Sequence, residues 1–273
     1  MKRLLYNILY IALAATASAQ EAIDTAQFVA VYDYECRTQD AEGTPVTDRM
    51  QLAVQVGRTV TKSMPLSAYQ RTDEITSADA AIEFQEAMLH MPEVWTDYPD
   101  GKVTVRDAIP PTIYETQEER KPINWELSDD TLTVAGFLCK FATCQLHGRK
   151  WTALYSEDIP TSAGPWKLCG LPGLILKAET NDGIHRFTLA SLQRIASPIY
   201  YETNAITSKT TEEKLIKNRI KTFGNRLYPK NPYYYITVNL NRTADVTSTN
   251  EGMIINNVFV NDKAHVYQPL EAK

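Results

Sequence analysis

The sequence predicts a mainly β protein of the α+β kind, with a strongly curved antiparallel sheet or half-barrel and two covering helices. Tyr and Thr, which favour strands, are abundant, whereas the 273 residues include only 11 Gly. Short runs of alternating apolar and polar residues recur along the chain, and turn signals separate them. Apolar residues at helical spacing occur in two segments. Together these observations indicate an antiparallel sheet with few helices.

The strands are predicted from their alternation. Along residues 27–36 the side chains of Phe28, Ala30, Tyr32 and Tyr34 share one face. Further strands are expected at residues 50–60, 94–98, 102–105, 112–118, 123–127, 131–139, 141–146, 150–155, 174–179 and 184–189, with a last one at 253–260. The Asp-Gly pairs at 100–101 and 182–183 predict tight hairpins, and Asp129–Asp130 predicts a turn.

Two helices are predicted near residues 77–90 and 211–223. Each follows a capping box, at residues 76–79 and 210–213, whose acidic side chains can accept from free backbone amides. Apolar residues then recur at helical spacing. We expect both apolar stripes to pack on the concave face or the rim of the sheet.

The first nineteen residues predict a secretory signal peptide. Lys2 and Arg3 precede an apolar run at residues 4–15, and Ala17-Ser18-Ala19 forms a small-x-small cleavage site. The alternative, a membrane anchor, is disfavoured because the run is shorter than the ~20 residues of a spanning helix. We therefore expect cleavage after Ala19, a single domain over residues 20–273, and a soluble product in the periplasm or outside the cell. The net charge of −5 disfavours nucleic acid and anionic lipid as partners.

Four cysteines are candidates for disulfides: Cys36, Cys139, Cys144 and Cys169. In an exported chain they predict two bridges. One possible pairing joins Cys139 to Cys144 and Cys36 to Cys169. Another joins Cys144 to Cys169, so the pairing stays open. A metal or redox site is disfavoured because the C-x4-C spacing lacks a second motif.

No catalytic signature is present: the chain lacks a Gly-x-Ser-x-Gly elbow, His-Glu-x-x-His, a P-loop and a dinucleotide-binding glycine pattern. The four histidines, His90, His147, His185 and His265, are scattered. Met88, His90 and Met91 are a conceivable copper-binding group, but core methionines beside a surface histidine explain them better. The sequence therefore predicts no catalytic residue, no metal and no cofactor.

One stretch, residues 148–176, is dense in Gly, Pro and Trp. Its candidate site residues are Gly164, Pro165, Trp166, Gly170, Leu171, Pro172, Gly173, Leu174 and Ile175. They are interpreted either as a ligand-contacting loop or, preferably, as a structural corner between strand layers, because these residue types carry little chemistry. Pro172-Gly173 predicts a type II turn. Trp151 and Trp166 are expected to pack over the bend.

This stretch resembles the GLPGLI family of exported Bacteroidota proteins. Residues 170–175 read Gly-Leu-Pro-Gly-Leu-Ile, and the segments 148–151, 158–160, 164–167 and 267–271 are also similar to the family pattern. Leu154 and Gln268 depart from it. The resemblance implies no established biochemical role. The strand rhythm is also similar to half-open β-barrel carriers of lipid-bearing cargo, which is an analogy of fold.

The expected function is non-catalytic: an envelope protein that binds an apolar ligand, lipid or peptide in the concavity of the sheet. One alternative is an accessory subunit of an outer-membrane (TonB-dependent) transporter, which an exposed apolar patch would favour. Another is a hydrolase with a dispersed site, because catalytic residues need not form a local motif.

Overall fold

A computed structural model describes residues 21–40, 42–70, 90–109, 112–201, 207–223, 227–228, 246–248, 252–255, 258–261 and 265–271. The predicted signal peptide at 1–19 lies outside these residues, as does the predicted helix near 77–90 apart from His90. In the described part of the chain, no helix has the length and apolar character needed to cross a membrane.

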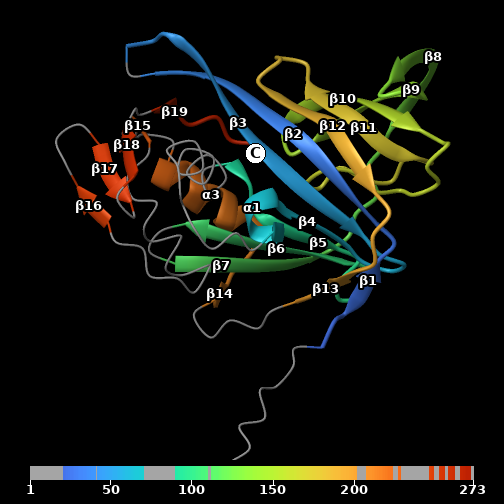
Figure 1. The fold of residues 1–273 in the computed structure, drawn as a ribbon, viewed down its shortest axis with the longest axis horizontal. Coiled ribbons are helices and arrows are strands. Elements are labelled where there is room, and N and C mark those ends of the chain that lie inside the picture. Colours follow the sequence, from blue (N-terminus) through green and yellow to red (C-terminus); the bar gives the residue numbers. More distant parts are fainter. Residues whose placement is uncertain are drawn as a thin grey trace, which may run out of the picture.

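One curved sheet of twelve strands dominates the structure and does not close into a barrel (Figure 1). Its strand order is β14-β7-β6-β5-β4-β3-β2-β12-β11-β10-β9-β8. The strands are β2 (Phe28–Gln39), β3 (Pro45–Val56), β4 (Thr61–Pro65), β5 (Glu93–Thr96), β6 (Lys102–Ile109), β7 (Thr112–Glu119), β8 (Glu126–Val134), β9 (Phe137–Leu146), β10 (Arg149–Ser156), β11 (Leu174–Thr180), β12 (His185–Gln193) and β14 (Thr207–Lys209). All neighbours are antiparallel except β14 and β7. The predicted fold class is thus confirmed.

The remaining strands form small separate sheets. These are β1 (Asp24–Ala26) with β13 (Ser197–Ile199), β15 (Leu227–Tyr228) with β19 (His265–Val266), and β16 (Val246–Ser248), β17 (Gly252–Ile255) and β18 (Val258–Asn261). The predicted last strand at 253–260 is therefore two strands, β17 and β18, that pair with each other. The described helices are α1 (Leu66–Gln70) and α3 (Glu212–Phe223), and α3 confirms the helix predicted at 211–223.

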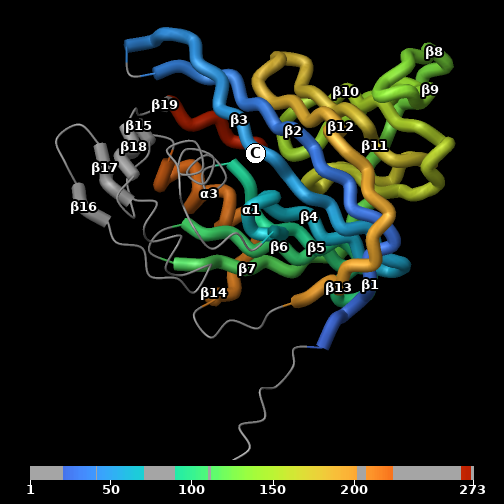
Figure 2. Tube along the Cα trace, viewed as in Figure 1, coloured from blue at the N-terminus to red at the C-terminus, as the bar shows by residue number. Residues whose placement is uncertain are grey.

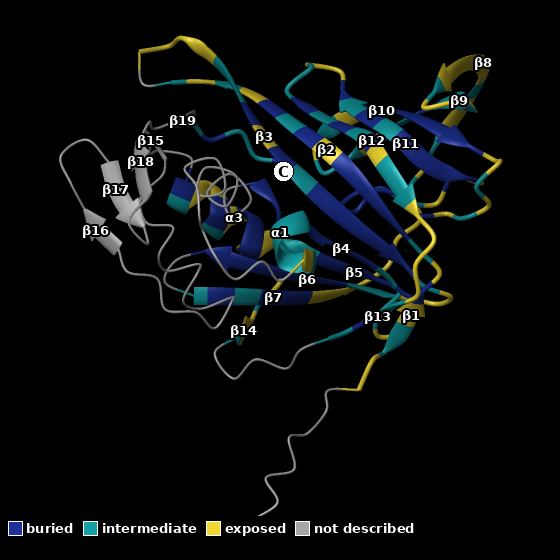
Figure 3. Cartoon of the chain, in the orientation of Figure 1, coloured by how far each residue is buried: buried dark blue, intermediate teal, exposed yellow. Residues whose placement is uncertain are grey.

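The hairpin of β8 and β9 differs from the prediction. The chain turns at Ala135 and Gly136, which both have positive φ, rather than at Asp129–Asp130. β8 holds more residues than the part of β9 that it pairs with, so its register shifts between Leu127 and Thr131. The two aspartates lie in this bulge, which satisfies their preference for irregular backbone without ending the strand. β8 is the edge of the sheet and is mostly exposed (Figure 3).

The first half of β2 is buried on both faces. Along β2, Ala30, Tyr32 and Tyr34 join the main core on the concave face, as the alternation predicts. On the convex face, Val29 joins a smaller core with Trp95 that the short strands β1 and β13 border.

The concave face is filled by the chain itself. α3 packs on β6 and β7 and buries Leu215 and Phe223. The C-terminal segment, residues 265–271, runs beside β2 and β3, where Figure 2 shows it in red next to the blue strands. Its Tyr267 and Leu270 are buried in the main core. A ligand in the concavity would therefore compete with α3 and this segment.

Candidate functional site

The Gly-Leu-Pro-Gly-Leu-Ile stretch lies in the core, at the loop that joins β10 to β11. Leu171, Leu174 and Ile175 are buried, and the Tyr32 hydroxyl donates a hydrogen bond to the carbonyl of Ile175 over 2.7 Å. Trp166 is buried against Trp151, with their ring centres 5.9 Å apart. The side chains of the motif thus make packing contacts at a bend of the chain.

The glycines of this loop are required for two different reasons. Gly170 has a φ of +94°, which disfavours any other residue. Gly173 lacks the positive φ of a type II turn, so the turn predicted at Pro172-Gly173 is wrong. Instead, a Cβ at Gly173 would lie 2.1 Å from the carbonyl oxygen of Ser156, and only glycine allows this close approach of two backbone segments.

None of the four cysteines forms a disulfide in the structure, and the disulfide prediction is corrected in that respect. Cys139 and Cys144 occupy one extended strand, β9, five residues apart. At about 3.3 Å per residue their Cα atoms are roughly 16 Å apart, beyond the reach of a disulfide. Burial raises the pKa of the Cys144 thiol to about 12 and raises the pKa of Cys169 as well.

A buried polar chain crosses the core. His185 Nε2 lies 3.1 Å from the carbonyl oxygen of Pro269, which can only accept, so this nitrogen carries the proton. Its Nδ1 therefore accepts from the Tyr34 hydroxyl at 2.8 Å. Burial, with smaller contributions from Arg149 and His90, lowers the pKa of His185 to about 3. Nearby, His90 Nε2 lies 2.8 Å from a buried carboxylate oxygen of Asp48. Neither His90 nor His185 lines the large cleft described next.

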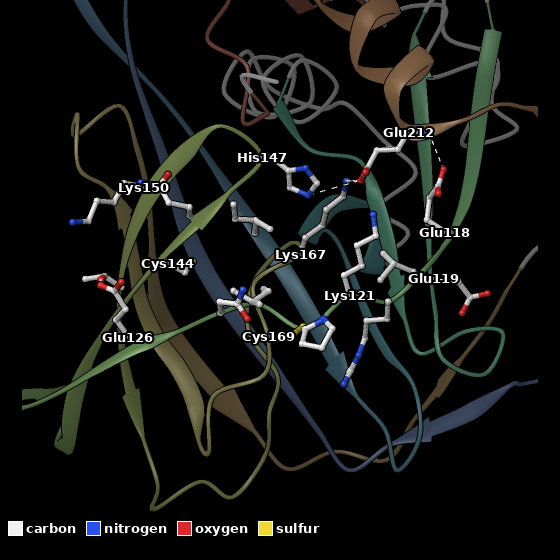
Figure 4. A pocket seen from close by; sticks show the side chains of 18 residues that line it. Glu118, Glu119, Lys121, Glu126, Cys144, His147, Lys150, Lys167, Cys169 and Glu212 are labelled. Carbon is white, nitrogen blue, oxygen red and sulfur yellow. Dashed lines mark hydrogen bonds and ion pairs between the residues drawn. The ribbon is translucent and has the colours of Figure 1, made fainter.

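The large cleft, of about 590 Å³, lies at the seam where the two ends of the curved sheet come near each other (Figure 4). One wall is the end of β7 and the connection to β8, residues 118–126, and the other is the end of β9, residues 143–147. We call this cavity the seam cleft. A second cavity, beneath α3, measures only about 20 Å³, roughly the space of one water molecule.

Eight charged side chains line the seam cleft, four of each sign. They are Glu118, Glu119, Glu126, Glu212, Arg120, Lys121, Lys150 and Lys167. Apolar residues such as Ile123 and Leu146 also line the cleft. Such a mixed lining suits a polar ligand that carries both donors and acceptors.

A charge cluster lies at the α3 side of the cleft. The Lys167 ammonium donates to Glu212 at 2.7 Å and to Glu271, and His147 Nε2 is 3.8 Å from Glu212. Burial opposes the charged form of Lys167, but Glu271 and Glu212 outweigh it and raise the pKa of the ammonium. Burial also opposes the Glu212 carboxylate, yet Lys167 lowers its pKa overall.

The same cluster has the spacing of a cation site. Ligand atoms of His147, Glu212 and Glu271 all lie within 4.8 Å of one another. The Lys167 ammonium bonds both carboxylates, however, and supplies the positive charge that a metal would bring. A metal could enter only if Lys167 moved away. The cluster therefore fits an ion-pair network that ties the C-terminal segment and α3 to the motif loop.

Sequence reasoning did not identify this cluster as a unit. Lys167 follows the motif tryptophan, Glu271 ends the C-terminal segment, and Glu212 was interpreted as part of a helix cap. All three belonged to segments singled out for other reasons. Their convergence depends on how the C-terminal segment returns across the sheet, which local patterns do not encode.

Comparisons with known proteins yield only a remote likeness. No family model and no curated protein matches the chain. It is similar to two crystal structures of PNGF-II, with 12% and 13% identity and TM-scores of 0.48 and 0.47. The matches cover 73% and 71% of this chain but 34% and 33% of the PNGF-II chains, so this chain spans about a third of that protein's length. A likeness with TM-scores below 0.5 carries no inference about function.

Proposed function

We propose that this is a non-catalytic binding protein of the cell envelope and that its ligand is a peptide held in the seam cleft. The observation that carries the proposal is the cleft itself: about 590 Å³, open at the seam of the sheet and lined by charges of both signs. The concavity first expected to hold the ligand is occupied by α3 and the C-terminal segment. Export rests on the predicted signal peptide at residues 1–19.

The lining favours a peptide over a lipid or another apolar ligand. Covering eight charged side chains with acyl chains would remove them from water without offering hydrogen bonds, which is costly. A peptide supplies a donor and an acceptor at nearly every residue and carries side chains of either charge. The cleft volume lies within the range typical of ligand pockets.

The chemistry of the lining favours binding over catalysis. Cys144 and Cys169 are the thiols that reach the cleft, and their raised pKa values keep them protonated and poorly nucleophilic. His147 lines the cleft, and burial, with a smaller contribution from Lys167, lowers its pKa. Its near neighbours are the carboxylates of Glu212 and Glu271 rather than a hydroxyl or thiol nucleophile. A hydrolase with a dispersed site has no such support.

A second function, an accessory subunit of an outer-membrane transporter, is favoured by one specific feature. Leu127, Leu132 and Leu138 on the β8–β9 hairpin are 60%, 50% and 59% exposed. They flank the outer edge of the sheet, where partner strands commonly add. The two roles are compatible if the hairpin holds a partner while the cleft holds a peptide.

Site-specific photo-crosslinking tests the proposal. A benzophenone amino acid would replace Gln145 in the cleft or, as a control, Asp33, which is exposed on the convex face of β2. After expression in a bacterial envelope, mass spectrometry should find peptide adducts at position 145 and none at position 33. Lipid adducts at position 145, or the same peptides at both positions, would contradict the proposal.

A further inference from the structure

We infer, on the basis of the proposed function, that the peptide binds by adding a strand to the free edge of β9 at Gln145, and that an acidic peptide is preferred. The chemical class is thus an extended, acidic segment of a polypeptide. Three features of the cleft support this inference: the end of the β8 ladder, the direction of the Gln145 backbone groups, and two lysines of the lining.

The edge of β9 is uncovered beside the cleft. β8 pairs with β9 from Val134 opposite Phe137 to Glu126 opposite Thr143, and there its ladder ends. β9 continues to Leu146 and pairs only with β10 over these last residues. Residues 144–146 therefore have a ladder partner on one side alone within the described chain. All three line the seam cleft.

The hydrogen bonds of β10 fix the direction in which Gln145 points. Gln145 lies opposite Lys150 in the ladder. The carbonyl of Lys150 accepts from the amide of Asn181 at 3.0 Å, on the side of β11 away from β9. Because antiparallel pairs alternate between bonded and non-bonded, Gln145 and Lys150 form a non-bonded pair. The N–H and C=O of Gln145 therefore point away from β10, toward the cleft.

The turn between the two strands agrees with this assignment. β9 and β10 are joined by two residues, His147 and Gly148, with φ values of 48° and 79°. Positive φ at both positions is the type I′ turn of two-residue hairpins. In such a hairpin the flanking residues, Leu146 and Arg149, form the bonded pair, so the next pair along is non-bonded.

The opposite wall of the cleft is also an open edge. The β14 ladder ends opposite Glu115, whose carbonyl accepts from the amide of Thr210 at 2.8 Å. At the other end of β7, the amide of Arg120 donates to Gly101 on the β6 side over 2.8 Å. By the same alternation the backbone groups of Glu119 face outward. No described strand pairs with either wall at the seam, and an added strand would satisfy the backbone groups that the described strands leave open.

Charge decides which peptide fits. Lys121 and Lys150 line the cleft, and neither is within 4 Å of a carboxylate of a described residue. Lys167, by contrast, is already paired with two carboxylates. Residues directly opposite in a sheet share a face, so a glutamate paired with Gln145 lies on the same face as Lys150. Glu118 and Glu126 line the cleft as well, but Glu118 accepts from the amide of Glu212 and Glu126 accepts from the hydroxyl of Thr143. An acidic peptide would neutralise the two lysines, which have no such partner among the described residues, whereas a basic peptide would add like charge.

The test uses two synthetic nonapeptides, one of alternating valine and glutamate and one of alternating valine and lysine. Titration calorimetry with the full chain should show tighter binding of the glutamate peptide, by about tenfold at low salt, with a difference that shrinks as salt is added. Equal binding of the two peptides would overturn the charge preference.

A proline substitution isolates the backbone contact. Gln145→Pro removes an N–H that the ladder with β10 does not use, so β9 should still form. We expect this variant to keep its circular dichroism spectrum and thermal transition but to bind the glutamate peptide about tenfold more weakly. Gln145→Ala keeps the N–H and should lose clearly less affinity than Gln145→Pro.

The outcomes separate this inference from the proposed function. If Gln145→Pro binds as well as the wild type, or if Gln145→Ala loses as much as Gln145→Pro, strand addition is overturned while peptide binding in the cleft stands. If the wild type binds neither nonapeptide, the inference fails; the proposed function fails with it only if crosslinking at position 145 also yields no peptide. A dimer in sedimentation that Gln145→Pro abolishes would make a second copy the occupant and overturn the inference.

Discussion

The hydroxyl of Tyr34 donates a hydrogen bond to Nδ1 of His185 over 2.8 Å, in the centre of the concave face. Through its other nitrogen, His185 donates to the carbonyl of Pro269 in the C-terminal segment. Arg149 donates to the same carbonyl at 2.7 Å. A neutral histidine thus links the middle of β2 to the segment that fills the concavity.

Removal of the Tyr34 hydroxyl should destabilise the fold. Tyr34→Phe leaves Nδ1 of His185 without its donor in a buried site, and we expect a loss of about 1–3 kcal/mol in the free energy of unfolding, measured with urea. Tyr69→Phe is the matched control, because the Tyr69 hydroxyl is only half-buried and 3.5 Å from Ser197. Equal losses for the two variants would contradict the link.

The protonation of His185 predicts a dependence of stability on pH. Its folded pKa of about 3 lies below the ordinary value of 6.5, so the unfolded chain takes up the proton first. This contribution to stability is complete above pH ~6.5 and is lost progressively as the pH falls toward 3. Nitrogen-detected NMR should show His185 neutral, with the proton on Nε2, at pH 5. A His185 that titrates near pH 6.5 in the folded protein would refute the assignment.

The strand pattern was predictable from the sequence because most strands of the twelve-stranded sheet bury one face or both; β8 and β14, which have no buried residue, are the exceptions. The alternation of β2 and the hairpin turn at Asp182-Gly183 are local properties of the chain. The bulge in β8 was missed because Asp129 and Asp130 suit a turn and an irregular strand equally. The prediction of a type II turn at Pro172-Gly173 was wrong because glycine is required there by its close approach to Ser156, which is not a local property of the chain.

The candidate site was less predictable because the contacts that form it are not local properties of the chain. The seam cleft joins the ends of β7 and β9 with Lys167, and these are brought together by the curvature of the whole sheet. The free edge at Gln145 follows from the place where β8 stops pairing. Register of this kind is set by the fold rather than by residue type.

Lys167 should stabilise the protein by neutralising two carboxylates. Lys167→Met leaves Glu212 and Glu271 facing each other, and we expect a loss of about 2 kcal/mol at pH 7. Because Lys167 holds the pKa of Glu212 below its ordinary 4.5, its contribution is present above that pH and is lost as the pH falls through the folded pKa. The difference between variant and wild type in urea should therefore shrink from pH 7 to pH 4.

The control for this variant is Lys177→Met, which breaks a partly exposed pair with Glu179 at 3.0 Å. A partly exposed pair of this kind is worth about 0–1 kcal/mol. If Lys177→Met lowers the free energy of unfolding as much as Lys167→Met does, the cluster around Lys167 stabilises the protein no more than a partly exposed ion pair. A pH-independent loss in Lys167→Met would point to lost packing instead.

The cysteines should behave as four thiols in the folded protein. Alkylation in urea without reductant, followed by mass spectrometry, should add four labels; two disulfides would give none. In the native protein at pH 8, Cys144 should react slowly, because burial raises its pKa to about 12 and little thiolate forms. Rapid native labelling of Cys144 would contradict its burial.

Gly173 should tolerate no side chain. A Cβ there would lie 2.1 Å from the carbonyl oxygen of Ser156, so Gly173→Ala must separate the backbones of β10 and the motif loop. We expect a loss of about 3 kcal/mol or more. Gly136→Ala is the control. Gly136 has a φ of +85° with open space around it, so alanine there should lower the free energy of unfolding only by the backbone strain, about 1 kcal/mol. If both variants unfold at the same urea concentration, the backbone conformation of Gly173, rather than its close approach to Ser156, explains why glycine is required there. If Gly173→Ala is instead indistinguishable from the wild type, the two backbones are not in contact, and the bend that positions Lys167 at the cleft is not held in this way.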